Sequence, residues 1–589
     1  MILQSLVRYY DALSNQGKLP AIGFGSGKVS YAIDINNEGE LIMLTNMSQL
    51  SDNGKNEVPQ IMPVPLQQTR SSGIVPYFLC DNAQYFLGLP KKGGEDTEKG
   101  ISDAAKKFSA SAKLHNEILE SVDAPEARAI LKFFEKWDPK GNQDNEVIKE
   151  RFEKLQTSNL VFAINGTFAQ DIKEIADAWL SYLDKDNAKK KTMTCLVTGR
   201  KEIPARIHPV IKGIRGGSST GNMLVSFNAN AFESYGREGD QGLNSPVGET
   251  SAQKYGMALN YLLSGNHVKK FADTTVVFWA ETGEEEYQDI FDWTFDGDQL
   301  SDKDLGDILD ELSKGNIAKV NERAIDGRTP FHILGLAPNS ARLAVRFYLR
   351  DSFGNMLNNV KEHNERLEII QPMNAHESLP LWKLIGETVR KTSTGKNAKD
   401  PVGSISAAVF RAVMQNTDYP VSLYQNVLLR INADKGINWR KAAIIKAYLL
   451  KNRNVNIPKE EVLRVELNKD CTYVPYVLGR MFAVLEKIQK VANPGINATI
   501  KDRYIGAASE RPATVYPKLL QLSNHHLRKL SEGANVYYSR ILTDLFGSIN
   551  RTFPQHFDLH DQGVWYVGYY HQIQDLYKKN DTVKDKEEK

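Results

Sequence analysis

The periodicity of apolar residues changes near Gly354, and this change constrains the fold more than any other feature of the chain. Before it, short apolar runs typical of buried strands lie at 160–164, 194–198, 223–227 and 274–280, among helical patterns such as 170–183. The alternation over 29–35, followed by a turn and an apolar return at 41–44, predicts a β-hairpin. After it, helical windows follow one another and strand patterns fade. The sequence therefore predicts an α+β N-terminal region followed by all-α helical regions.

A chain of 589 residues is too long for one hydrophobic core, so a multidomain protein is expected. We expect three regions, divided where the patterns change. A mixed α/β region covers residues 1–354, a helical connecting region covers 355–470, and a C-terminal helical bundle covers 471–589.

Composition also indicates the compartment. No window approaches 18 consecutive apolar residues, so no membrane span is expected. The N-terminus lacks the small-residue cleavage site of a secretory signal. Cys80, Cys195 and Cys471 lie far apart in the sequence, which supports neither a disulfide framework nor a cysteine zinc site. A cytoplasmic location fits these features.

Charge is segregated along the chain, although the formal net charge is only +2. Residues 185–237 hold ten Lys and Arg against three acids, whereas residues 281–311 hold thirteen acids and one base. Cations beside small residues favour a polyanion, because a glycine backbone approaches a ligand closely. This pattern predicts a cationic cleft over 185–244 that binds nucleic acid.

Within that segment we expect cations to neutralise phosphates and short polar side chains to contact phosphates or base edges. The alternative is a surface loop with solvated lysines. The short segment around Arg70 has the same chemistry. The candidate DNA-binding residues are Lys212, Arg215, Ser218, Ser219, Asn228, Asn230, Arg237 and Asn244, with Arg70 and Ser71 next.

Catalytic signatures are lacking in the sequence. It contains no His-Glu-x-x-His pattern. The glycine-rich segment 23–28 departs from the Walker spacing, because Ile22 and Val29 stand where that motif requires Gly and Ser or Thr. We therefore expect no catalytic residues, no cofactor and no metal, while an active site of dispersed residues stays an open alternative.

The C-terminal part combines cations with tyrosines, as single-strand binding sites do. The cations are Lys518, Arg528, Lys529 and Arg540, and Tyr516, Tyr537 and Tyr538 lie among them. One interpretation is contact with an unpaired strand. The other is that the tyrosines only pack helices together.

Several blocks, in order over nearly the whole chain, resemble one known family. They lie at 2–11, 72–82, 195–199, 207–213, 224–228, 231–236, 273–281, 334–342 and 440–447. This set is similar to the large subunit of the type I-C CRISPR interference complex, Cascade. None of the blocks is a catalytic signature.

The resemblance implies a non-catalytic subunit of a guide-RNA-directed DNA surveillance complex. Such a subunit recognises a short duplex motif beside the target, promotes unwinding of the DNA and stabilises the R-loop. It also recruits a helicase-nuclease. The implied partners are target double-stranded DNA, guide RNA through the complex, the Cascade backbone and guide-end-capping subunits, a small subunit and the helicase-nuclease, with no membrane.

The family also makes a small subunit by internal translation, and Met481 is a plausible start because a helical pattern begins there. The acidic segment 281–311 is then interpreted as a face towards protein partners. Two rival functions stay open from the sequence. One is a metal-dependent nuclease that uses these acids, and the other is an assembly scaffold whose basic loop binds guide RNA.

Overall fold

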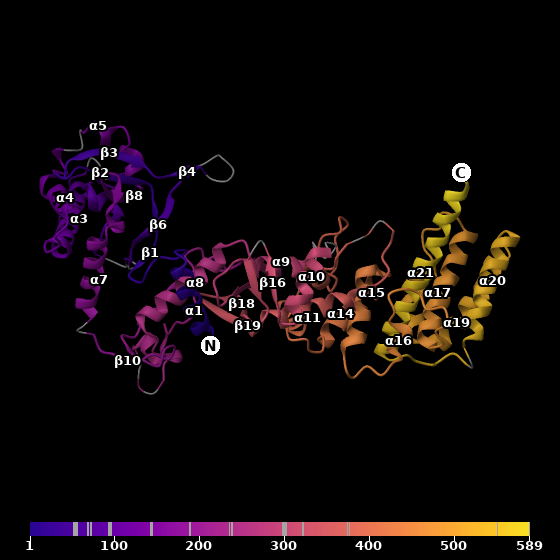
Figure 1. The fold of residues 1–589 in the computed structure, drawn as a ribbon. Helices are drawn as coiled ribbons and strands as arrows, with labels where there is room; N and C mark the ends of the chain where they lie inside the picture. The colour runs from indigo at the N-terminus through magenta and orange to yellow at the C-terminus, as the bar shows by residue number, and fades with distance from the viewer. Residues whose placement is uncertain are drawn as a thin grey trace. The chain divides into compact units, whose positions relative to one another are not determined.

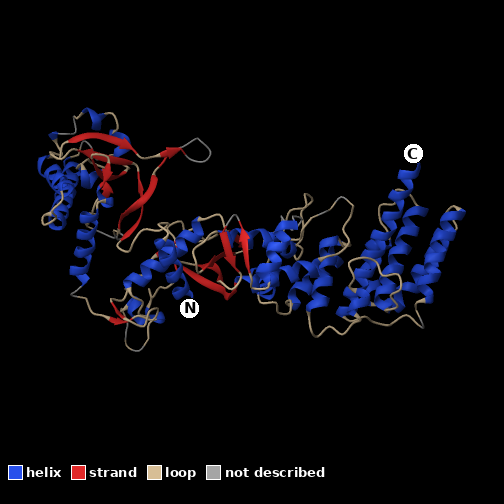
Figure 2. Ribbon diagram, viewed as in Figure 1, coloured by secondary structure: helices blue, strands red, loops and turns tan. Residues whose placement is uncertain are grey.

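The structure is a computed structural model of the whole chain, and Figures 1 and 2 show its helices and strands. The chain forms two compact units. Unit 1 comprises Met1–Pro209 and Val225–Leu259, and unit 2 comprises Val210–Leu224 and Asn260–Lys589. The structure describes every residue except 51–56, 68–69, 71–72, 92, 94–96, 142–144, 188–189, 235, 237–238, 272, 297–302, 321–322, 374, 376, 550–551 and 588–589.

A five-stranded sheet organises unit 1, in the order β3-β2-β8-β7 with β9 paired to β8. The hairpin predicted after Val29 is confirmed as β2 (Tyr31–Ile35) and β3 (Leu41–Asn46), and β8 (Asn159–Ile164) lies parallel to β2. The other strands are β1 (Phe24–Val29), β4 (Gln49–Leu50), β5 (Glu57–Val58), β6 (Gln60–Pro65), β7 (Cys80–Asn82), β9 (Thr167–Phe168), β10 (Met193–Thr194) and β11 (Lys201–Glu202).

Helices cover this sheet and enclose an aromatic core. His115 of α3 lies against the rings of Phe78, Phe86 and Phe134, and these side chains are buried. The helices are α1 (Ile2–Asn15), α2 (Ala83–Phe86), α3 (Glu98–Leu119), α4 (Pro125–Lys136), α5 (Glu146–Lys149), α6 (Phe152–Leu155), α7 (Lys173–Asn187) and α8 (Glu249–Ser264), whose last residues belong to unit 2.

Two short strands predicted within the basic segment were wrong in extent. The pattern at 194–198 forms only the end of β10, because the chain turns around the Cys195 sulfur, which accepts the N–H groups of Val197 and Gly248 at 3.4 and 3.2 Å. The pattern at 223–227 contributes only Met223 to a strand, since the chain passes into unit 1 at Val225.

A six-stranded sheet organises the first part of unit 2, in the order β12-β13-β19-β18-β15-β14. Its longest pair is the antiparallel hairpin of β18 and β19, which the sequence patterns did not single out. Its strands are β12 (Val210–Ile211), β13 (Asn222–Met223), β14 (Val268–Phe271), β15 (Thr274–Ala280), β18 (Pro330–Asn339) and β19 (Arg342–Ser352). A separate two-stranded sheet of unit 2 pairs β16 (Ile317–Val320) with β17 (Arg323–Asp326).

After Ser352 every named element of the described chain is a helix, so the predicted fold class is confirmed (Figure 2). The helices of unit 2 are α9 (Glu286–Asp296), α10 (Lys303–Ser313), α11 (Phe353–Leu367), α12 (Leu381–Gly386), α13 (Gly403–Met414), α14 (Val421–Asp434), α15 (Trp439–Lys451), α16 (Lys459–Val462), α17 (Val474–Ala492), α18 (Ile500–Glu510), α19 (Pro512–Leu527), α20 (Glu532–Gly547) and α21 (Leu559–Glu587). Among the described residues, no helix combines the length and apolar composition that crossing a bilayer requires.

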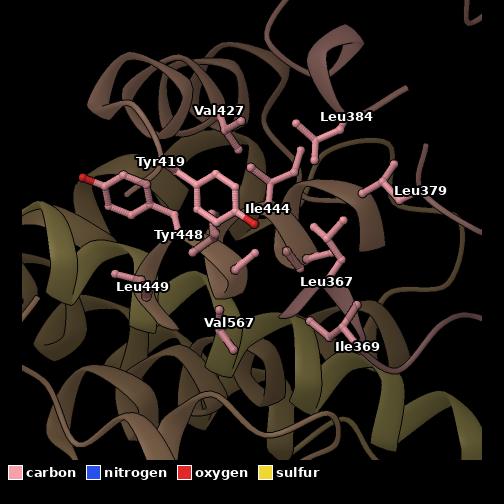
Figure 3. Packing of buried hydrophobic residues seen from close by; sticks show 14 of the residues in the cluster. Leu367, Ile369, Leu379, Leu384, Tyr419, Val427, Ile444, Tyr448, Leu449 and Val567 are labelled. Carbon is pink, nitrogen blue, oxygen red and sulfur yellow. The ribbon is translucent and has the colours of Figure 1, made fainter. Parts of the chain in front are cut away.

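One hydrophobic core runs from the sheet of unit 2 through its helices. Figure 3 shows part of it, where Leu384 of α12, Ile444 of α15 and Val567 of α21 belong to the same cluster. Met481 is fully buried inside α17, seven residues after the helix begins, so the helical pattern starts before Met481. An internal translation start at Met481 stays a prediction. The division into three regions stays a prediction.

Candidate nucleic-acid interface

Residues 212–221 connect β12 to β13 and form an exposed loop, which we call the glycine hairpin. Its backbone turns through Gly213, Gly216 and Gly221, which have positive φ angles. At Gly221 a Cβ atom would lie 2.3 Å from a side-chain carbon of Val210, so no larger residue fits there without a shift. The local sequence thus permits a tight loop at the edge of the sheet.

Buried polar side chains brace this loop. Asn222 is 1% exposed, its Oδ1 accepts the Ser218 N–H at 3.0 Å, and its Nδ2 donates to the Ser340 carbonyl at 2.7 Å. Asn260 Oδ1 accepts the Lys212 N–H at 2.9 Å, and Thr275 Oγ1 accepts the Arg215 N–H at 3.1 Å. The backbone of the hairpin is therefore held from three sides before any ligand binds.

The polar and charged side chains of the hairpin lie in solvent, whereas Ile214 is buried. Lys212, Arg215, Ser218 and Ser219 are all exposed, and within the described residues Lys212 forms no ion pair. Arg215 reaches Asp400, with 3.3 Å between Nη2 and Oδ2, and both side chains are largely solvated. Such an exposed pair contributes little stability and is readily exchanged for a phosphate.

The remaining candidates of the segment belong to unit 1. Asn228 and Asn230 are exposed. Asn244 is half-buried, and its amide contacts the same unit, since Nδ2 donates to the Gln241 carbonyl at 3.1 Å and Oδ1 accepts the Ser234 N–H at 3.3 Å. The structure therefore divides the predicted residues between two units, and their joining in one cleft stays a prediction. Arg237 and Ser71 lie outside the described residues.

Arg70 is engaged inside unit 1. Its guanidinium lies over the rings of Tyr77 and Tyr85, at 3.7 and 4.1 Å from their centroids, and its Nε donates to the Val75 carbonyl at 2.6 Å. Its Nη2 forms an ion pair with Asp81, which is 1% exposed. Burial raises the pKa of the Asp81 carboxyl, and the Arg70 guanidinium offsets part of that shift. Contact of Arg70 with DNA stays a prediction.

The C-terminal cations lie on the helical surface, whereas two of the three tyrosines are core residues. Tyr516 is fully buried and donates to the Leu478 carbonyl at 2.6 Å, and Tyr538 is 8% exposed. Tyr537 alone of the three is exposed, at 37%. The exposed cations are Lys518, whose Nζ lies 5.6 Å from the centroid of the Tyr504 ring, Arg528, Lys529, whose Nζ donates to Asn493 at 3.3 Å, and Arg540.

The acidic segment is partly neutralised within unit 2. Residues of α9 and α10 pair with cations that the sequence places elsewhere: Glu286 with Arg323 at 2.5 Å, Asp292 with Lys269 at 2.8 Å, and Asp310 with Lys361. Part of the predicted acidic face is therefore engaged in ion pairs within unit 2. No three His, Cys, Asp or Glu side chains of the described residues gather as ligands of one metal ion.

A second basic loop, at residues 390–399, adjoins the glycine hairpin through the Arg215–Asp400 pair, and the sequence analysis missed it. It holds Arg390, Lys391, Lys396 and Lys399 without an acid, interleaved with Thr, Ser and Gly. That composition matches the glycine hairpin on a smaller scale. Its charge is not apparent over longer stretches of sequence, because Glu387 and Asp400 flank the loop.

The chain matches a known protein family. The family described as CRISPR-associated protein (Cas_Csd1) matches residues 6–577, which is nearly the whole chain. No curated protein matches the chain.

Proposed function

The chain belongs to the CRISPR-associated Csd1 family, and from this premise we propose that it is the large, non-catalytic subunit of a guide-RNA-directed DNA surveillance complex. In this proposal it recognises a short duplex motif beside the target, promotes unwinding and R-loop stabilisation, and recruits a helicase-nuclease. The family assignment confirms the resemblance found in the sequence blocks.

The glycine hairpin is the observation that carries the proposal. It presents two cations and two hydroxyl groups, Lys212, Arg215, Ser218 and Ser219, on a backbone that Asn222 and its neighbours hold in place. A braced loop loses little conformational freedom on binding, so its contacts contribute more fully to affinity. Cations and hydroxyls on glycine-rich backbone suit the phosphates of a duplex.

In a guide complex, base pairing with the guide RNA recognises the target sequence, so the protein does not need many side chains for sequence recognition. The protein then contributes phosphate neutralisation and a few contacts to the motif. We assign the motif contacts to the exposed Asn228 and Asn230 together with Asn244. We assign contact with an unpaired strand to the C-terminal cations Lys518, Arg528, Lys529 and Arg540.

The double variant Lys212→Ala/Arg215→Ala tests the proposal. Loss of two phosphate contacts should weaken duplex binding by the full-length protein and flatten the slope of log K against log salt by about 1.8. Lys319→Ala is the matched control, because Lys319 is an exposed cation on β16, which belongs to a different sheet from β12 and β13. Unchanged affinity and slope in the double variant would remove the hairpin from the DNA site.

Two further assays address the rival functions. Incubation of the purified protein with DNA and Mg²⁺ or Mn²⁺ should give no cleavage, and cutting would contradict the non-catalytic role. Crosslinking of the assembled complex should link the glycine hairpin to target duplex. Linkage to guide RNA alone would favour the scaffold instead.

A further inference from the structure

Residues 390–399 form a compact loop of unit 2, which we call the threonine hairpin. The Thr392 N–H donates to the Lys396 carbonyl at 2.8 Å, and the Ala398 N–H donates to the Arg390 carbonyl at 2.8 Å. Lys391 Nζ donates to Asn397 Oδ1 at 2.7 Å across the base of the loop. These bonds give the exposed loop a defined backbone.

Three of its four cations are available to a ligand. Arg390, Lys396 and Lys399 are exposed and form no ion pair with any residue that the structure describes. Lys391 is half-buried and lies 3.7 Å from Glu387, so it stabilises the base of the hairpin. The hydroxyl groups of Thr392 and Thr394, which lie 2.9 Å apart, add neutral hydrogen-bonding groups among the cations.

An exposed tryptophan lies beside this hairpin. Trp382 of α12 is 54% exposed, although its neighbours Leu381 and Leu384 are buried in the core. Figure 3 shows Leu384 in that core. Gly386 lies one helical turn after Trp382, on the same side of α12. A Cβ atom at Gly386 would lie 3.3 Å from Asn397 and from Lys391 Nζ, so the base of the hairpin packs on that side of the helix.

The Trp382 ring does not pack into the hydrophobic core of unit 2. Among the described residues, the cation–π contact of this ring is with Lys383, whose Nζ lies 5.4 Å from the ring centroid. A ligand that covers the exposed part of this ring removes apolar surface from water, which favours binding. A solvated ring beside free cations is the combination by which proteins hold unpaired nucleotides, because a base stacks on the ring and phosphates meet the cations.

We propose that Trp382 and the threonine hairpin form a binding site for unpaired nucleotides of a DNA strand. Trp382 stacks on one base, while Arg390, Lys396 and Lys399 neutralise the adjoining phosphates. The inference rests on the proposed function, since unwinding of a duplex held at the glycine hairpin releases unpaired strands. The Arg215–Asp400 contact places the end of the threonine hairpin beside that duplex site.

Binding of the full-length protein to a labelled single strand of about 12 nucleotides tests the site, in parallel with a duplex of the same sequence. Trp382→Ala should weaken single-strand binding about tenfold without changing its salt slope, because the ring carries no charge. Lys396→Ala/Lys399→Ala should flatten the single-strand slope by about 1.4. Both variants should leave duplex affinity within about twofold of the parent value.

Two variants serve as controls. Trp382→Phe keeps an aromatic ring and should retain most of the single-strand affinity. Tyr577→Ala removes another exposed ring beside a lysine, Lys487, whose Nζ lies 4.3 Å from its centroid, and should change nothing.

The outcomes separate this inference from the function on which it rests. If Trp382→Ala leaves single-strand affinity unchanged while the Lys212→Ala/Arg215→Ala variant weakens duplex binding, the inference is wrong and the proposed function stands. If Trp382→Ala instead abolishes association with another protein of the complex and spares single-strand affinity, the surface binds a protein, which also overturns the inference. If the glycine-hairpin variant has no effect but Trp382→Ala weakens single-strand binding, the site stands and the duplex role fails.

Discussion

Replacing Asn222 by alanine tests whether a buried amide holds the glycine hairpin in its binding conformation. The substitution removes the acceptor of the Ser218 N–H and the donor to the Ser340 carbonyl, at 3.0 and 2.7 Å. Each hydrogen bond contributes about 1 kcal/mol net, so the free energy that favours the closed loop over the open loop falls by about 2 kcal/mol. This loss corresponds to an increase of about 30-fold in the equilibrium constant for opening of the loop.

Hydrogen-exchange mass spectrometry with overlapping peptides measures that opening. The amides of Ser218 and Gly221 should exchange about 30-fold faster in Asn222→Ala, in proportion to the population of the open loop. The amides of Lys212 and Arg215 should keep most of their protection, because Asn260 and Thr275 still accept them. Duplex affinity should fall while its salt slope stays constant, since no charge is removed.

Asn266→Ala is the control, because Asn266 is exposed and makes none of these contacts. Unchanged exchange over 218–221 in Asn222→Ala would refute the argument that this side chain braces the loop. Faster exchange with unchanged duplex affinity would show that rigidity of the hairpin does not contribute to binding.

Three further predictions concern stability. Arg70→Ala leaves the buried Asp81 carboxylate without its ion-pair partner. The free energy of unfolding of unit 1, measured by thermal or denaturant unfolding, should therefore fall by about 3 kcal/mol. Retained stability would contradict the buried ion pair. Burial lowers the pKa of His115 to about 4, so on acidification the unfolded chain binds this proton before the folded chain does. The free energy of unfolding therefore falls as pH drops from 6.5 towards 4. In His115→Gln the slope of this free energy against pH should decrease by about 1.4 kcal/mol per pH unit, and an unchanged slope would assign the proton to another group. Gly479→Ala places a Cβ atom 2.0 Å from the Trp565 carbonyl oxygen, between α17 and α21, and should destabilise unit 2 by about 3 kcal/mol in urea unfolding. Gly533→Ala on α20, which has open space around it, should instead stabilise unit 2 by about 0.5 kcal/mol. Equal effects of the two substitutions would contradict the close approach of α17 and α21.

Local patterns in the sequence predicted much of the fold. The hairpin of β2 and β3, the buried strands β8 and β15 and most helices after Gly354 follow from apolar periodicity, which depends only on near neighbours along the chain. The patterns failed in two places in unit 2. The hairpin of β18 and β19 lacked a recognised signal, and the run at 223–227 forms no full strand because its chain leaves the sheet.

The functional candidates divide in the same way. Composition identified the glycine hairpin, since its glycines and cations are adjacent in sequence. It did not reveal that Arg70 is engaged by Asp81, that Tyr516 is buried, or that Trp382 is exposed. Exposure depends on packing between distant elements, so residue type alone does not predict it.

The amino-acid order by itself determined the class of each segment and the total charge that it carries. The tertiary structure decided which charges stay available to a ligand. Arg215 meets Asp400 across 185 residues, and Asp310 meets Lys361 across 51. Electrostatic interaction depends on separation in space, and only the folded chain sets that separation.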